Sequence, residues 1–251
     1  MYRIRGGTTL LRGTVSRGFN APPLSFRFVE NLRFRRLPNP DIKAERAWVY
    51  QLGAEMRPVS YLRSKLTVFR AEISDAIEIS QTDSIEVPGP EGPMMMPMLR
   101  PQNVAYRRRQ GAELEIQWVT PWGVSGSAGT MFCDVRNFAD SAPGFFSLEG
   151  GRIVRDRARL TYDVGLDYET PFGIRANLRG HSVWWNTLPD WGTIDQRFIW
   201  DVKISSPSYR IGRARFEGVA SVYNLFDAHF RASVLYPLPE RWFEGGVRCT
   251  F

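Results

Sequence analysis

An alternation of apolar and polar residues at period two constrains this chain more than any other feature. The clearest example is the segment 157–170, in which every charged residue falls between apolar ones. Its apolar positions are Ala158, Leu160, Tyr162, Val164, Leu166 and Tyr168. Successive side chains of a β-strand point to opposite sides. The pattern therefore predicts a strand with one dry face and one wet face.

Ten such segments follow one another, bounded by glycine, proline, asparagine and aspartate. The predicted strands are 8–17, 46–57, 61–73, 104–119, 122–136, 157–170, 172–186, 195–206, 212–225 and 241–251. In the last five, the dry positions hold no Asp, Glu, Lys or Arg. A charge facing lipid at mid-depth of a membrane barrel costs roughly 2 to 4 kcal/mol, so lipid is the favoured surrounding. Segment 61–73 loses its phase near Val68 and Phe69, which predicts a bulge.

The connections alternate between short and long. Short turns are expected at 57–60, 120–123, 170–173 and around 206–208, and long loops at 18–45, 74–103, 137–156, 186–194 and 226–240. Aromatic residues gather near the strand ends, as in the two interfacial girdles of membrane barrels. In a soluble β-sandwich, nothing places the short loops at one end of the strands and the long loops at the other. The sequence thus predicts an all-β, antiparallel transmembrane β-barrel.

Composition narrows the function classes. The net charge is +7, and only Lys43, Lys65 and Lys203 are lysines, so the other 30 of the 33 basic residues are arginines. This charge is dispersed, whereas nucleic-acid binding requires it to be clustered, so no nucleic-acid partner is expected. The two cysteines and two histidines have no metal-ligand spacing. We therefore expect no metal, no cofactor and no enzymatic activity.

Five short motifs resemble those of one family, the TonB-dependent outer-membrane receptors. The motifs are Ser16–Leu24 (SRGFNAPPL), Asn39–Glu45 (NPDIKAE) followed by Tyr50–Gly53 (YQLG), Gln110–Glu115 (QGAELE), Tyr223–Asp227 (YNLFD) and Pro237–Phe251. They occur in the order and spacing of the family and extend over nearly the whole chain. One departure is Gln110, where the family pattern has arginine.

The resemblance implies that residues 1–251 are the C-terminal part of a plugged barrel of about 22 strands in the outer membrane of a Gram-negative bacterium. Such receptors import a scarce ligand, often a ferric siderophore or a cobalamin, with energy from the TonB complex. The resemblance also implies partners: a plug, the N-terminal barrel strands, the TonB complex, the barrel-assembly machinery, and outer-membrane lipid with lipopolysaccharide. We expect the plug and the signal peptide to be absent from this chain.

Two other interpretations remain open. The chain could be a free-standing ten-strand outer-membrane barrel with a structural, adhesive or enzymatic role, which requires its first and last strands to pair. It could also be a soluble β-rich binding domain, which the dry strand faces argue against. An isolated sheet with open edges would expose unpaired backbone groups to lipid, so we expect the isolated chain to fold poorly.

Two groups of arginines are candidates for binding an anionic ligand at an external funnel. They are Arg33, Arg35 and Arg36 in the first long loop and Arg107, Arg108 and Arg109 at the start of a strand. Solvated faces and contacts to lipopolysaccharide phosphates are the alternative interpretations of both groups. A third candidate is the run Met94–Met96 with Met98, because clustered thioethers bind Cu(I). Its alternative is a flexible apolar loop tip.

The wet faces supply candidate lumen-facing residues. These are Asp163, Asp167, Arg175, Arg179 and His181, on neighbouring predicted strands. Opposite charges on adjacent strands indicate ladders that face water or a plug rather than a catalytic carboxylate cluster. At the other end of the chain, Phe243, Val247 and Phe251 resemble the C-terminal signal for the barrel-assembly machinery. The alternative is an ordinary lipid-facing last strand.

Overall fold

The structure is a computed structural model, and it is nearly all strand. It describes residues 2–4, 8–31, 35–89, 92–138, 147–148, 153–154, 157–185, 198–229, 231–233, 236–237 and 239–251. One short helix, α1 (Leu24–Phe28), is present in these ranges. No helix of the described residues is long and apolar enough to cross a membrane.

Each of the ten predicted strands matches a strand of the structure. They are β2 (Thr9–Asn20), β3 (Glu45–Val59), β4 (Leu62–Gly89), β5 (Gly92–Val119), β6 (Val124–Asn137), β9 (Ala158–Glu169), β10 (Arg175–Trp185), β11 (Ile199–Ser205), β13 (Ala214–Tyr223) and β16 (Trp242–Thr250). The main sheet also contains the shorter strands β1 (Tyr2–Ile4), β7 (Ser147–Leu148), β8 (Ile153–Val154) and β12 (Tyr209–Ile211). Two more, β14 (Arg231–Ser233) and β15 (Tyr236–Pro237), pair with each other in a separate sheet. The all-β prediction is confirmed.

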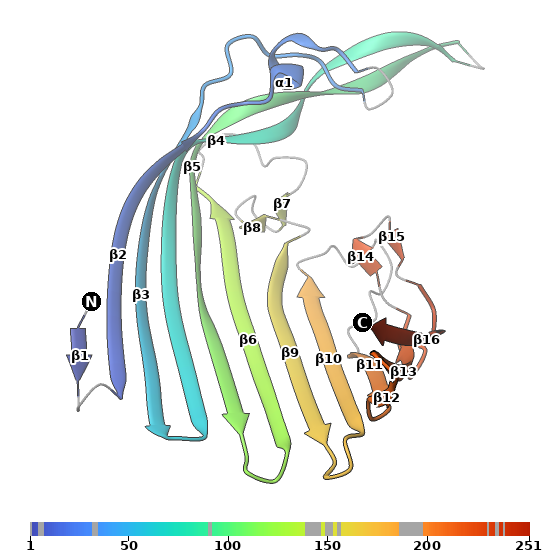
Figure 1. Ribbon diagram of the computed structural model, residues 1–251. Helices are drawn as coiled ribbons and strands as arrows, with labels where there is room; N and C mark the ends of the chain where they lie inside the picture. The colour runs from blue at the N-terminus through green and yellow to red at the C-terminus, as the bar shows by residue number, and fades with distance from the viewer. Residues whose placement is uncertain are drawn as a thin grey trace.

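The main sheet has 14 strands and follows the chain from β1 to β6, then β9, β10, β11 and β13. Its strand pairs are antiparallel, and both β12 and β16 pair with β13. Figure 1 shows a curved sheet with short turns at the bottom and longer connections at the top. Among the described residues the sheet is not closed, because no pairing joins the β1 end to the β16 end.

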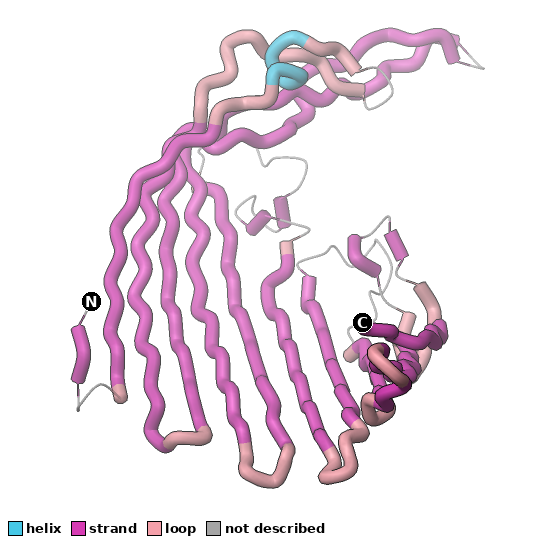
Figure 2. Tube along the Cα trace, viewed as in Figure 1, coloured by secondary structure: helices cyan, strands magenta, loops and turns pink. Residues whose placement is uncertain are grey.

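The prediction of a loop over 74–103 is wrong. Strands β4 and β5 have 28 residues each and pair as far as Gly89 and Gly92. The part of this hairpin from residue 75 to residue 103, called the arm from here on, leaves the sheet at the top of Figure 2. The methionine run therefore lies in a strand, where Met98 is fully buried and Met94 is 55% exposed.

Proline-rich sequence suggested a loop, but the spacing of the prolines suits a strand. Pro93, Pro97 and Pro101 are four residues apart, so they face the same side of β5. Leu99 lies on the same side as these prolines. Its N–H bonds to the Arg35 carbonyl and its C=O accepts the Leu37 N–H, so these groups do not bond to β4. The prolines thus occupy positions at which a backbone N–H would not bond to β4. A strand tolerates proline at such positions.

The predicted bulge near Val68 and Phe69 is also wrong. Pairing with both neighbouring strands runs through these residues without a break, and the shifts lie between Met56 and Val59 and between Gln81 and Asp83. The phase is lost because Phe69, Ala71 and Ile73 place apolar residues on the side of the strand that carries Lys65. Phe69 packs there against the buried cluster of Cys133, Val135 and Val154.

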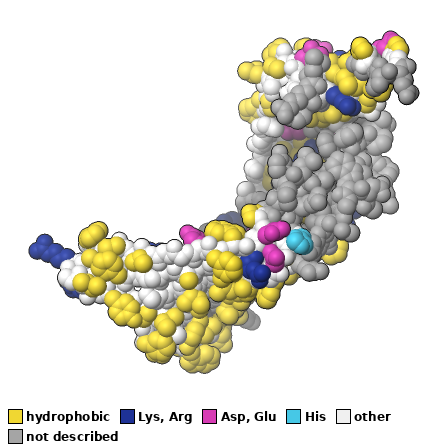
Figure 3. Space-filling model, turned by 90° about the vertical axis from the view of Figure 1, so that its right-hand side faces the viewer, with side chains coloured by type: hydrophobic (Ala, Val, Ile, Leu, Met, Phe, Trp, Pro, Cys, Tyr) yellow, Lys and Arg dark blue, Asp and Glu magenta, His cyan; other side chains and the backbone are white. Residues whose placement is uncertain are grey.

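The two faces of the sheet differ as the alternation predicts. We call the face with Asp163, Asp167 and His181 the inner face and the opposite one the outer face. Most exposed large hydrophobic side chains within the strands lie on the outer face, including Leu52 (66%) and Val247 (73%). Figure 3 shows hydrophobic side chains gathered over the lower part of one side of the molecule.

The near-copies Thr120–Gly123 and Thr170–Gly173 fold alike. In each, the threonine N–H bonds to the carbonyl four residues ahead, at 2.8 and 2.9 Å. The threonine hydroxyl also bonds to that carbonyl. Gly123 and Gly173 have φ values of +76° and +87°, which side chains rarely adopt, so the glycines permit these turns.

Candidate functional site

The predicted lumen-facing residues lie together on the inner face. Asp163 and His181 are register partners on β9 and β10, with 2.6 Å between Oδ1 and Nδ1. Four residues further along β9, Asp167 accepts hydrogen bonds from Asn177 and from Arg179 Nη2, the latter at 2.7 Å. These carboxylates are engaged by neighbouring strands, so the arrangement is a polar ladder.

The fifth residue of that prediction, Arg175, joins a different group. Its Nη2 lies 2.7 Å from Oε1 of Glu217 on β13, and Arg248 Nη1 of β16 lies 3.6 Å from the other oxygen of Glu217. Glu217 is 8% exposed. Two arginines thus neutralise one buried carboxylate and link β10, β13 and β16 across the inner face. The sequence analysis did not single out Glu217, because one glutamate on a wet face carries no distinct signal.

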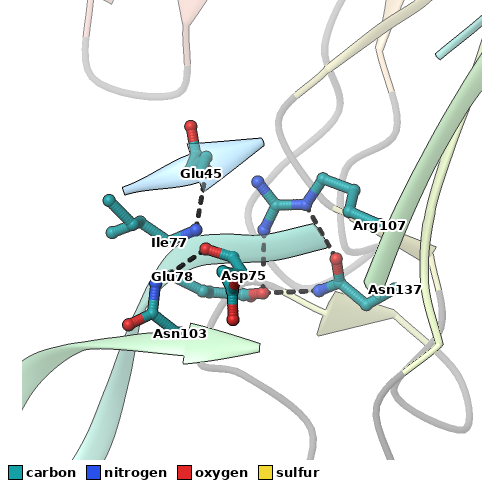
Figure 4. Close-up of polar contacts among 7 residues, drawn as sticks. All are labelled: Glu45, Asp75, Ile77, Glu78, Asn103, Arg107 and Asn137. Atoms are coloured by element: carbon teal, nitrogen blue, oxygen red, sulfur yellow. Dashed lines mark hydrogen bonds and ion pairs between the residues drawn. The ribbon is translucent and has the colours of Figure 1, made fainter. Parts of the chain in front are cut away.

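A buried polar network lies at the base of the arm and holds Arg107 (Figure 4). Arg107 donates from Nη2 to Glu78 Oε2 at 3.0 Å and from Nε to Asn137 Oδ1 at 2.8 Å. Asn137 in turn donates to Glu78 Oε2. Glu78 and Asn137 are 6% and 4% exposed. Sequence reasoning missed this network because residue 78 was assigned to a loop.

Hydrogen bonds between side chains and backbone groups join the same region to the start of β3 and to the segment just before it. Glu45 Oε1 accepts the N–H of Ile77 at 2.7 Å. Asn103 donates to the carbonyls of Asp75 and Lys43 and accepts the Lys43 N–H. Asp75 has φ +56° and marks the bend where the arm begins. Lys43 and Glu45, at the end of the motif Asn39–Glu45, therefore bond to the base of the arm, as Figure 4 shows for Glu45.

The run Arg107–Arg109 is divided between the two faces, because alternate residues of β5 point to opposite sides. Arg107 and Arg109 belong to the inner face, and Arg109 stacks over the ring of Phe69 at 5.6 Å. Arg109 is exposed, and no ion pair of the described residues involves it. Arg108 belongs to the outer face. The three arginines do not form one cluster.

Arg35 and Arg36 of the first long loop lie along the arm. Arg33 is outside the described residues. The Arg35 carbonyl accepts the Leu99 N–H at 2.7 Å, and the Arg36 guanidinium lies 4.8 Å from the centre of the Phe26 ring. Leu99 and Arg107 are eight residues apart on β5, about 27 Å along a strand. The described arginines of the first loop and the run Arg107–Arg109 are therefore on separate surfaces.

Asn224 has a structural role that could not be inferred from the motif Tyr223–Asp227. Its side chain donates to the Ala228 and Pro239 carbonyls and accepts the Ala228 N–H, and its backbone N–H bonds to Asp201. It is 5% exposed, with φ +51°. This asparagine closes the turn after β13 and fixes the approach to β16.

The residues predicted to form the assembly signal lie on β16 and just after it. Phe243 and Val247 pair with Val222 and Gly218 of β13, and Phe251 follows the strand. All three are exposed, with Phe251 at 97%. No group of three or more His, Cys, Asp or Glu side chains in the described part of the chain is placed to hold a metal ion.

Comparison with known proteins agrees with this architecture. The family model described as "TonB dependent receptor-like, beta-barrel" matches residues 1–225. The chain belongs to this family. The members of the TonB-dependent receptor family are outer-membrane proteins of Gram-negative bacteria. No match was found among curated protein sequences.

Solved structures of TonB-dependent receptors share the fold. The copper transporter OprC superposes with a TM-score of 0.71 at 17% identity, over 98% of this chain and 39% of OprC. A mutant of the ferric enterobactin receptor PfeA from Pseudomonas aeruginosa gives 0.68 at 19% identity, over 96% and 38%. The siderophore receptor PirA from Acinetobacter baumannii gives 0.64 at 14% identity, over 95% and 38%. The chain therefore spans less than two fifths of the length of these receptors.

Proposed function

We propose that this chain is the C-terminal part of the barrel of a TonB-dependent receptor that imports a scarce ligand across the outer membrane. The ligand class is a ferric siderophore, a cobalamin or a similar chelate. Family membership supports import in general. The observation that carries the finer proposal is Arg109, an exposed cation on the inner face beside an aromatic ring and without a carboxylate partner among the described residues.

Arg109 suits an anionic chelate for a physical reason. A guanidinium that is already paired offers little to a ligand, whereas an unpaired one provides several N–H donors in a planar fork. The ring of Phe69 lies beneath the guanidinium and holds it in place. Arg107 adds positive charge nearby, but Glu78 neutralises it. Among the six arginines of the sequence prediction, Arg109 is therefore our proposed ligand contact.

In this proposal the protein resides in the outer membrane. A plug and the remaining barrel strands complete the barrel. The inner-face ladders contact that plug, the TonB complex acts through it, and the barrel-assembly machinery inserts the protein. The alternative, a free-standing ten-strand barrel, requires the β1 end of the sheet to pair with the β16 end.

The test uses the full-length protein that contains this chain, produced in cells that lack their own receptors. Uptake of radioactive iron from a ferric catecholate and of cobalamin is measured with and without TonB. We expect TonB-dependent uptake of one ligand, reduced at least tenfold in Arg109→Glu, with Arg12→Glu on the inner face of β2 as the matched control. Uptake that is independent of TonB would overturn the import proposal, and equal effects of both variants would overturn the role of Arg109.

The free-standing alternative is tested separately with the isolated 251-residue chain in detergent. A shift in gel mobility on heating would indicate that this chain closes a barrel alone. We expect no such shift, because neither end of the sheet formed by the described residues has a partner strand for its backbone groups.

A further inference from the structure

The two edges of the arm differ in the backbone groups that they present. On β5, the residues whose backbone groups point away from β4 are the odd-numbered ones from 93 to 101. Three of these five residues are prolines, which have no N–H, and the N–H of Leu99 bonds to Arg35. Of the described residues on this edge, Met95 alone keeps an N–H without a described partner. The β5 edge is therefore closed to a further strand.

The opposite edge, on β4, is open. Residues directly opposite each other in an antiparallel pair either both bond across the ladder or both point away from it. The β4 residues opposite 101, 99, 97 and 95 are Ile79, Gln81, Ser84 and Glu86. None of them is a proline, so each presents both an N–H and a C=O to the outside. The pairing of β3 with β4 stops at Ser74, and no described residue pairs with β4 on this side beyond it. We call residues 79–86 of β4 the open edge.

The open edge is accessible, and the other edge shows that the arm can hold an added segment. Gln81, Ser84 and Glu86 are exposed. Figure 2 shows the tip of the arm reaching beyond the other described elements. At the closed edge, Leu99 bonds through its N–H to the Arg35 carbonyl at 2.7 Å and through its C=O to the Leu37 N–H at 2.8 Å. The arm thus already binds one extended segment through backbone groups.

The outer part of the arm is acidic in a basic chain. Residues 79–98 contain three acidic residues and no lysine or arginine, whereas the net charge of the whole chain is +7. Two of the three, Asp83 and Glu86, belong to β4 itself. A second copy of this edge, or any acidic strand, would bring like charges next to each other, which is unfavourable. The charge therefore favours a basic partner.

We propose that the open edge binds an extended, positively charged segment of another protein as an added β-strand. Backbone hydrogen bonds to the four outward-pointing residues provide the affinity, and the acidic residues of the outer arm select lysine or arginine side chains. The inference does not rest on the proposed import activity. It uses neither Arg109 nor the inner face of the sheet, so either proposal can fail without the other.

The experiment measures binding of labelled peptides to the full-length protein in detergent, by fluorescence anisotropy. The probe is a short synthetic peptide that alternates lysine with threonine. One control peptide has the same sequence with every backbone N–H methylated, so it cannot form a ladder. The other has glutamate in place of lysine. We expect the probe to bind about tenfold more tightly than either control.

Two proline substitutions separate the edges of the arm. Ser84→Pro removes an outward N–H from the open edge, and Met95→Pro is the matched control on the closed edge. Neither N–H bonds across the ladder of β4 and β5. We expect about tenfold weaker binding of the probe for Ser84→Pro and unchanged binding for Met95→Pro. Glu86→Lys should weaken binding severalfold, and added salt should weaken it in the wild type.

Equal binding of the plain and the methylated peptide would overturn the proposal, because charge alone would then explain the binding. So would equal binding of the glutamate peptide, or equal losses in Ser84→Pro and Met95→Pro. Self-association of the wild type that Ser84→Pro abolishes would overturn it as well, by assigning the open edge to a second copy of the protein. The comparison of peptides uses wild-type protein, so it does not depend on the folding of any variant.

Discussion

Gly180 and Trp200 are register partners on β10 and β11, and the indole ring lies flat over the glycine. A Cβ placed on Gly180 would come within 2.7 Å of the ring. The same pairing joins Gly126 to Trp118 on β6 and β5, where the closest approach would be 2.3 Å. Both tryptophans thus lie against bare backbone, which gives a strand glycine a packing partner and lets a large ring lie close to the sheet.

The first prediction is that Gly180→Ala destabilises the barrel by about 1 to 3 kcal/mol, because the ring must move from its position. Gly18→Ala is the matched control, since nothing lies within 4 Å of the position of its Cβ. The measurement is the temperature at which the full-length protein loses its fast-migrating folded form. Adding Trp200→Leu should restore part of the loss. A control that is as damaging as Gly180→Ala would disprove the steric explanation.

The second prediction concerns the turn after β13. Asn224→Ala removes three side-chain hydrogen bonds at a buried site and places alanine at φ +51°, so we expect a loss of about 3 kcal/mol. Asn224→Gly should recover only the backbone part of that loss. If glycine were as stable as asparagine in the same melting experiment, the hydrogen bonds would contribute nothing and the φ value alone would explain the residue.

The third prediction concerns the arm. Arg107→Met leaves Glu78 and Asn137 buried without their cation, and breaking a buried ion pair in this way costs about 3 to 5 kcal/mol. We expect the arm to be cleaved faster by an added protease, while the strands below it stay protected. The control Lys65→Met breaks an exposed pair with Glu115 and should change little.

Cleavage confined to the arm would distinguish a local opening from global unfolding. If Arg107→Met and wild type were cleaved at equal rates, the network would not be what holds the arm. Combining Glu78→Leu with Arg107→Met should restore much of the protection, because neither charge is then left alone.

The period-two pattern sufficed to predict the ten main strands, since a face that excludes charge is visible in sequence. It failed where both faces of a strand share one character, as at Phe69, whose inner-face packing was interpreted as a bulge. It also failed in the arm. Pro97 and Pro101 are typical of a loop, but they stand at strand positions where an N–H would point away from β4.

The candidate site was only partly predictable for a similar reason. Alternation places Asp163 and His181 on one face, and their contact follows from register. Alternation also implies that Arg108 faces away from Arg107 and Arg109, but the run was treated as one cluster. The partner of Arg107 could not be inferred, because Glu78 approaches it only when the arm bends at Asp75.

The last prediction concerns the end of the chain. Phe251 is 97% exposed, and it follows an edge strand whose outer face also presents Phe243 and Val247. A fully exposed phenylalanine adds nothing to packing within this chain, so Phe251→Ala should leave the melting temperature of assembled protein unchanged. If the residue is instead bound by the assembly machinery, the variant should reach the outer membrane in severalfold smaller amounts. Phe226→Ala, at a side chain 70% exposed in the turn after β13, is the control. Quantifying folded protein in isolated outer membranes separates the two roles, because only a recognition role lowers the amount without altering stability.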